Sequence, residues 1–132
     1  MPMSTVRSAC PCGSGLALPA CCGRWHEGPG HLQAPDALTL MRSRYSAYAL
    51  GRVDYLLDTW HASTRPATLD ALPEGLKWLG LEVRRHEMNG AQGAEVEFVA
   101  RSKWAGKAHR MHEVSRFVRE TGQWWYLGGQ VR

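Results

Sequence analysis

The chain has 132 residues, of which 44% are hydrophobic and six are tryptophan, and its formal net charge is +4. This length suits one compact domain with a small appendage and excludes two large domains, while the aromatic content argues against a disordered chain. No apolar run has the length of a membrane span, and the first residues lack the apolar region of a signal peptide. We therefore expect a soluble, cytoplasmic protein that does not enter the membrane.

Residues 10–23, with the sequence CPCGSGLALPACCG, contain every cysteine of the chain. Cytosolic thiols are kept reduced, and a bridge between such close neighbours would be strained, so disulfides are disfavoured. A zinc ion tolerates this spacing because each sulfur only has to lie about 2.3 Å from one centre. The spacing and the compartment thus favour zinc over disulfides or free thiols.

A metal held by four protein ligands has no free position for water or substrate, so the ion is expected to be structural. Residues 1–30 contain few large apolar groups, too few to offset the entropy lost on ordering them. Zinc contributes on the order of 10–16 kcal/mol in small finger peptides, which is ample here. His26 is a competing ligand that we disfavour, because four thiolates already complete a tetrahedron.

The pattern C-x-C-x8-C-C-G, with GSG after the second cysteine, resembles the SEC-C motif. This zinc-binding module is known from the C-terminal tail of the SecA preprotein translocase motor and from many otherwise unrelated proteins. The resemblance implies the zinc ligands Cys10, Cys12, Cys21 and Cys22. Many members carry basic and aromatic residues after GSG, whereas Leu16 and Ala17 stand here, so the resemblance implies no binding role that depends on that positive charge.

After the cysteines, residues 23–35 are rich in glycine and proline and lack periodicity, which indicates a connector and a boundary near residue 30. Pro35 and Asp36 then introduce a helix that ends at Gly51. Its apolar face is formed by Leu38, Met41, Tyr45 and Tyr48. A second short helix is predicted in residues 52–61, RVDYLLDTWH, before Pro66.

From residue 78 the hydrophobic period changes to two, which predicts four strands joined by short turns. The expected strands are WLGLEVRRHEM, AEVEFVARSKW, HRMHEVSRFVRE and QWWYLGG, with turns at 89–93, 105–107 and 121–122. Helices followed by an antiparallel meander predict an α+β fold in which the helices cover one face of the sheet.

The runs LMRSRYSAY, YLLDTW, EVEFVAR, HEVSRF and WWYLGG, behind this cysteine motif, resemble the YchJ-like family of bacterial proteins. The larger domain of that family is similar to the nuclear transport factor 2 superfamily, also called cystatin-like, in which a curved sheet wraps against helices into a cone. The resemblance implies a SEC-C zinc knuckle and connector in residues 1–30 and a nuclear transport factor 2-like domain in residues 31–132. Superfamily members include enzymes and plain binding modules, so this fold alone selects no chemistry.

In such a cone a pocket would lie between the concave sheet and the first helices. Candidate pocket residues are Tyr45, Trp60 and His61 from the helical side and His112, Glu113 and Arg116 from the third strand. Because neighbouring strand residues face opposite ways, His112 and Glu113 cannot share one pocket.

Glu113 falls on the more apolar face of its strand, where a carboxylate needs a partner such as Arg42 or Arg44. A structural ion pair is favoured over a general base, and the tryptophans are favoured as packing residues over a ligand cage. We therefore assign no catalytic residue, and a non-catalytic role is favoured over an enzyme.

Residues 100–110, ARSKWAGKAHR, carry four cations without an acid, and Trp104 stands near the predicted hairpin tip. Such a segment could hold phosphates and stack a base, which would place the protein on nucleic acid or ribosomes. A solvated hairpin protected by lysines is the favoured interpretation.

Together these patterns predict a zinc-binding, non-catalytic adaptor whose knuckle presents a rigid surface to a protein partner, as the similar translocase module does. One alternative is a small-molecule-binding protein or enzyme that uses the cone pocket. The other is nucleic-acid or ribosome association through the 100–110 hairpin.

Overall fold

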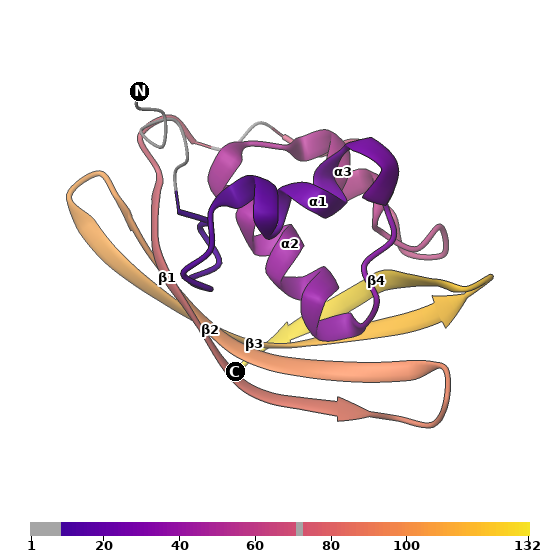
Figure 1. Ribbon diagram of the computed structural model, residues 1–132. Coiled ribbons are helices and arrows are strands. Elements are labelled where there is room, and N and C mark those ends of the chain that lie inside the picture. Colours follow the sequence, from indigo (N-terminus) through magenta and orange to yellow (C-terminus); the bar gives the residue numbers. More distant parts are fainter. Residues whose placement is uncertain (1–8, 71–72) are drawn as a thin grey trace.

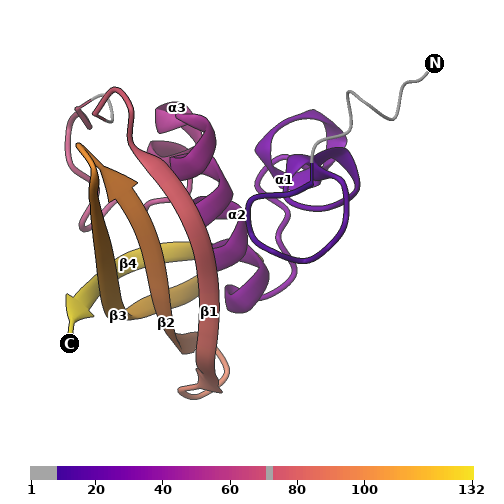
Figure 2. The same ribbon diagram turned by 90° about the vertical axis from the view of Figure 1, so that its left-hand side faces the viewer.

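A computed structural model describes residues 9–70 and 73–132 of the chain. The first eight residues of the predicted N-terminal module therefore lie outside the described part. Figures 1 and 2 show a curved antiparallel sheet with helices on its concave side and the N-terminal segment beyond them. None of the helices in the described ranges is long and apolar enough to cross a membrane.

The sheet is a simple meander of four antiparallel strands in the order β1, β2, β3, β4. Their bounds are Lys77–Met88, Gly93–Trp104, Lys107–Glu120 and Gln123–Val131, which confirms the strands predicted from the alternating pattern. Register shifts interrupt the β1–β2 and β3–β4 ladders, and such bulges bend a strand and increase its twist. The sheet is accordingly curved and open at both edges (Figure 1).

Helix α2 (Ala37–Leu50) lies across the concave face of the sheet and is followed by the shorter α3 (Val53–Asp58). The Asp36 carboxylate accepts a hydrogen bond of 2.7 Å from the Thr39 N–H, which caps the first turn of α2. Gly51 closes the last turn with a φ of 74°, a conformation that favours glycine. Both predicted ends of this helix are therefore confirmed.

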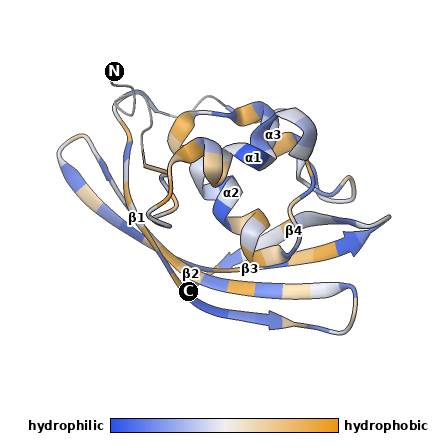
Figure 3. Ribbon diagram, viewed as in Figure 1, coloured by the Kyte–Doolittle hydropathy of each residue, from blue (hydrophilic) through white to orange (hydrophobic). Residues whose placement is uncertain are grey.

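The core lies between α2 and the concave face of the sheet. Apolar and polar residues alternate along β2 and β3, as Figure 3 shows, so one face of these strands is apolar. The buried residues that pack there are Leu40, Met41 and Tyr45 from α2 and Val96, Phe98, Ala100, Phe117 and Trp124 from the sheet. The four cysteines belong to the same buried cluster.

The N-terminal module, here residues 9–30, packs on the side of α2 that faces away from the sheet (Figure 2). The sequence predicted an unpatterned connector in residues 23–35, whereas the structure contains the short helices α1 (Gly23–His26) and η3 (Gly28–Gly30) there, preceded by the turn η2 (Leu18–Ala20). Helix α2 is consequently buried on two sides, since it has the sheet on one and the module on the other. Ser43, Ser46 and Ala47 are each fully buried.

Candidate functional site

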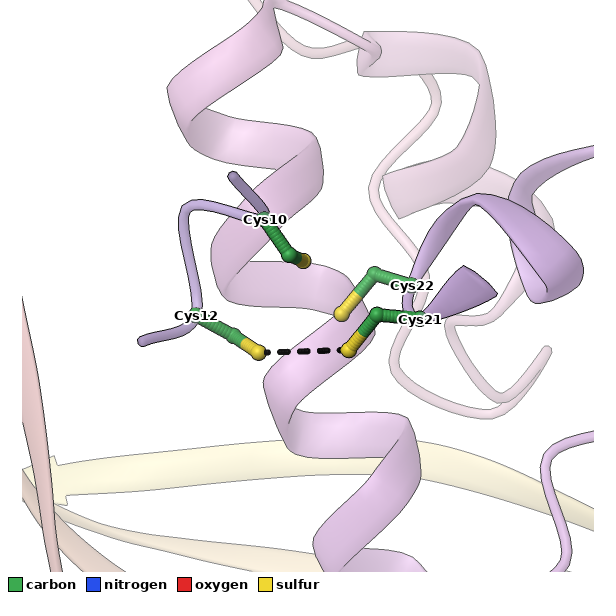
Figure 4. A group of neighbouring side chains, drawn as sticks. All are labelled: Cys10, Cys12, Cys21 and Cys22. Atoms are coloured by element: carbon green, nitrogen blue, oxygen red, sulfur yellow. Dashed lines mark hydrogen bonds between the residues drawn. The ribbon is translucent and has the colours of Figure 1, made fainter. Parts of the chain in front are cut away.

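The sulfurs of the four cysteines converge on one point, as Figure 4 shows. Cys10 and Cys12 come from the loop before η2, and Cys21 and Cys22 come from the residues just before α1. All four sulfurs lie within 4.8 Å of one another, and the Cys12 and Cys21 sulfurs are 3.6 Å apart. A tetrahedral Zn²⁺ with bonds of about 2.3 Å would separate its sulfurs by about 3.8 Å. The arrangement could therefore hold a metal ion with little movement.

Burial and mutual contact set the charge of this cluster. Hydrogen bonding with Cys22 lowers the pKa of Cys12 to about 4. The same contact and, to a smaller extent, burial raise the pKa of Cys22. Burial is the main cause that raises the pKa of Cys21. A thiolate is thus favoured at Cys12 while Cys21 and Cys22 keep their protons. A divalent cation at the centre would favour all four thiolates, because its charge outweighs their repulsion.

The loop between the cysteine pairs turns polar groups toward the sulfurs. Gly13 and Gly15 have φ values of 84° and 88°, a backbone conformation that favours glycine. The Ser14 backbone contributes to the lowered pKa of Cys12 through a hydrogen bond, and the Ser14 hydroxyl lies 3.1 Å from the Cys21 sulfur. These contacts hold the sulfurs in place and partly neutralise their charge.

The glycine after the second cysteine pair is required by close packing. A Cβ at Gly23 would lie 2.8 Å from the carbonyl oxygen of Leu18, a distance that backbone atoms do not tolerate. Any side chain there would push the η2 turn away from Cys21 and Cys22. The final glycine of the C-C-G pattern thus keeps the two halves of the module together.

Helix α2 contacts this site through side chains that the sequence pattern did not mark. The Ser46 hydroxyl lies 3.3 Å from the Cys10 sulfur, and Arg42 donates a hydrogen bond of 3.1 Å to the Cys12 carbonyl. His26 directs Nε2 to the Ser43 carbonyl at 2.8 Å and is not part of the sulfur cluster. Hydrophobic periodicity considers only apolar residues, so it could not identify these serines.

A second feature is a cavity of about 220 Å³ between α2 and the concave face of the sheet. Two of the predicted pocket residues, Tyr45 and Glu113, line it together with Arg44. Trp60 is not a lining residue, but its ring lies 5.2 Å from the Arg44 guanidinium. His61 does not line the cavity either.

The remaining candidates lie outside this cavity. His61 pairs with Glu120, with 2.9 Å between Nε2 and Oε2. His112 contacts Glu97, with 2.6 Å between Nε2 and Oε2, and is absent from the lining. The expected separation of His112 from Glu113 onto opposite faces thus agrees with the structure, and Arg116 is exposed.

The expected ion pair between Glu113 and Arg42 or Arg44 does not occur within residues 9–70 and 73–132. Arg44 instead donates to the Leu56 carbonyl and the Thr59 hydroxyl at 2.7 and 2.6 Å. Glu113 accepts a hydrogen bond of 2.6 Å from Ser115. Each side chain thus has neutral hydrogen-bond partners and no direct ion-pair partner among the described residues, and both line the cavity.

The 100–110 segment forms the hairpin between β2 and β3. Its cations are exposed, and Trp104 is 45% exposed. The indole N–H of Trp104 donates to the Glu74 carbonyl at 3.3 Å, and the Arg101 guanidinium lies 3.7 Å from Glu82. The aromatic ring and one cation are therefore already engaged within the protein.

Comparison with known proteins identifies the family of this chain. Residues 36–129, from the cap of α2 to β4, match the family described as YchJ, middle NTF2-like domain. The chain belongs to the YchJ-like family. A UPF0225 protein of Methylibium petroleiphilum is 63% identical over 122 residues, which cover 92% of this chain and 88% of the relative. One from Bordetella parapertussis is 54% identical over 125 residues, which cover 95% and 94% of the two chains.

Two solved structures share this YchJ-like fold. A SEC-C motif containing protein from Rhodopseudomonas palustris has a TM-score of 0.80 and 33% identity over 93% of this chain and 98% of its own. Another, from Psychrobacter arcticus, has a TM-score of 0.74 and 28% identity over 93% and 82% of the two chains. The predicted combination of a SEC-C motif with an α+β, nuclear transport factor 2-like fold is confirmed.

Proposed function

We propose that this YchJ-like protein binds one structural Zn²⁺ in the cytoplasm through Cys10, Cys12, Cys21 and Cys22, and that it is a non-catalytic adaptor. The observation that carries the proposal is the closed set of four buried sulfurs, whose residues are between 1% and 8% exposed. Four protein ligands complete the tetrahedron preferred by zinc and leave no position for a substrate. The metal would fix the module, and the module would present a surface to a protein partner.

The surface offered to that partner is the tip of the knuckle. Leu16 is 52% exposed although its backbone is fixed on both sides. Its carbonyl accepts a 2.8 Å hydrogen bond from the Cys10 N–H, and its own N–H donates to Ser14 at 3.1 Å. An apolar side chain on a fixed backbone can be buried in a partner without the entropic cost of ordering that backbone, which supports a docking role.

Metal content tests the first part of the proposal. Native mass spectrometry of the reduced protein is expected to show one zinc ion per chain, which a strong chelator removes. Cys21→Ser should lose the metal, because a neutral hydroxyl is a poor ligand for Zn²⁺. Ala20→Ser, at the exposed neighbouring position, is the matched control and should retain it. A metal-free sample in which residues 9–30 keep their structure would refute the zinc site.

The adaptor role is tested by capture from a bacterial lysate with cross-linking and identification by mass spectrometry. The wild-type protein should enrich a partner that Leu16→Lys fails to retain. Leu79→Lys places the same charge at a comparably exposed leucine, 58% accessible, on β1 and should retain the partner. Equal capture by the wild-type protein and Leu16→Lys, with zinc bound in both, would show that the knuckle only stabilises the fold.

A further inference from the structure

A buried cation lines the cavity between α2 and the sheet. Arg44 is only 4% exposed, and its Nη1 reaches two neutral acceptors, the Leu56 carbonyl and the Thr59 hydroxyl. The ion pairs found within the described ranges do not include it. A buried guanidinium without a directly paired carboxylate is costly, so this charge favours an anion that can contact it.

The tyrosine whose ring lies against the Arg44 guanidinium does not provide a negative charge. The guanidinium lies 4.1 Å from the centre of the Tyr126 ring, which stabilises the cation through the ring face. Burial, followed by the negative charge of Glu113, raises the pKa of Tyr126 to about 12. Its hydroxyl is therefore neutral at physiological pH and cannot act as a counter-ion.

The opposite wall of the cavity carries an acid. Glu113 projects from β3, and its Oε2 accepts the Ser115 hydroxyl at 2.6 Å. Gly129 on β4 makes room for this side chain, since a Cβ there would collide with the Glu113 carboxylate. A cation from the helix and a carboxylate from the sheet thus face one space from opposite sides.

The walls between these two groups are largely aromatic and apolar, formed by Tyr45, Trp78, Phe98, Met111 and Phe117. Such walls give water few hydrogen-bond partners, so water alone would solvate the two polar groups poorly. At about 220 Å³ the cavity is smaller than the pockets of roughly 300–1,000 Å³ that hold drug-sized ligands. Its dimensions suit a molecule with a single ring.

We propose that this cavity binds a small one-ring organic acid, whose carboxylate pairs with Arg44 and whose hydroxyl group donates to Glu113. The planar guanidinium recognises a carboxylate with two parallel hydrogen bonds, and Glu113 has a second oxygen beyond the one that Ser115 occupies. The ring would pack against the aromatic walls. This ligand site is inferred from the cavity residues and does not rest on the proposed zinc site or on the adaptor role.

Three probes separate the contributions of the two polar groups. Para-hydroxyphenylacetate carries both a carboxylate and a hydroxyl, phenylacetate lacks the hydroxyl, and para-cresol lacks the carboxylate. Affinities are measured by titration calorimetry and by NMR shifts of the Trp78 indole. Para-hydroxyphenylacetate should bind most tightly, phenylacetate several-fold more weakly, and para-cresol at least about tenfold more weakly, as expected for a lost charged hydrogen bond. Undetectable binding of para-hydroxyphenylacetate at millimolar concentration, or equal binding of para-cresol, would overturn the proposal.

Two variants locate the binding in this cavity. Ala100→Leu adds volume to a lining residue and should abolish binding, while the thermal melting profile shows that the protein stays folded. Glu113→Gln should remove most of the preference for the hydroxylated probe over phenylacetate, and Glu82→Gln, an exposed acid on β1, should leave that preference unchanged. An Ala100→Leu protein that is folded and binds with wild-type affinity would place the ligand elsewhere and refute the site.

Discussion

Ser43 on α2 forms hydrogen bonds with both α3 and the N-terminal module. Its hydroxyl donates to the Leu40 carbonyl and accepts a hydrogen bond from Tyr55 on α3, both at 2.7 Å. Its carbonyl accepts from His26 of the N-terminal module at 2.8 Å. Burial raises the pKa of Tyr55 to about 12, so the phenol keeps its proton and remains a donor. A small polar residue thus connects the module, α2 and α3.

Ser43→Ala should lower the free energy of unfolding by about 1–3 kcal/mol, because the buried Tyr55 hydroxyl loses its partner. Urea denaturation at neutral pH, with zinc present, measures the change. The double variant Ser43→Ala with Tyr55→Phe removes both partners and should cost less than the sum of the two single variants. Strict additivity would show that the two hydroxyls do not interact.

At the scale of elements, the sequence predicted most of the fold because its signals are local. Alternating residues marked the four strands, and Asp36 and Gly51 marked the ends of α2. Buried polar residues were harder to anticipate. Helix α2 buries Ser43, Arg44 and Ser46, whose burial depends on partners far away in sequence.

Sequence likewise located the cysteine cluster but not the whole arrangement of the cavity. The cysteines were found because metal ligands of this kind are close together in sequence. The placement of Glu113 on the inner face followed from strand alternation, but its separation from Arg44 by a cavity did not, because it depends on packing between a helix and a sheet. The short turns in residues 18–30 also escaped prediction, because they form around the sulfur cluster and have no periodicity of their own.

The cap of α2 can be tested at this scale. Asp36→Ala should lower the free energy of unfolding by about 1 kcal/mol, because the Thr39 N–H loses its acceptor. Chemical denaturation measures the loss, and Asp36→Asn, which preserves an acceptor, should recover most of it. Asp70→Ala removes an exposed acid outside the helices and should change stability little. Equal stability of Asp36→Ala and the wild-type protein would show that the cap contributes nothing.

Across the whole molecule, the sulfur cluster and the sheet share one buried core through α2. A division of the chain near residue 30 therefore need not produce two independent folding units. Residues 9–30 contribute four buried cysteines to this core, and if these bind the proposed metal, its removal would leave buried thiols in place of a tetrahedral centre.

Chelation should accordingly lower the melting temperature of the entire protein. Calorimetry of the zinc-loaded and chelated forms is expected to show a single transition in each, with the chelated form melting at a lower temperature. Addition of zinc to the chelated sample should restore the original profile. A high-temperature transition that is identical in both forms would mean that the sheet and its helices are stable without the module.

Helix α2 presents Arg44 and Tyr45 to the cavity and Arg42 and Ser46 to the cysteines. The position of α2 therefore affects both the cavity and the cysteine cluster, which lie on opposite sides of this helix. Thermodynamic reciprocity then applies: if an occupant of the cavity and a metal bound by the cysteines favour the same helix position, each must raise the affinity for the other by the same factor. The affinity of the cysteines for metal would thus change when a ligand occupies the cavity on the other side of α2.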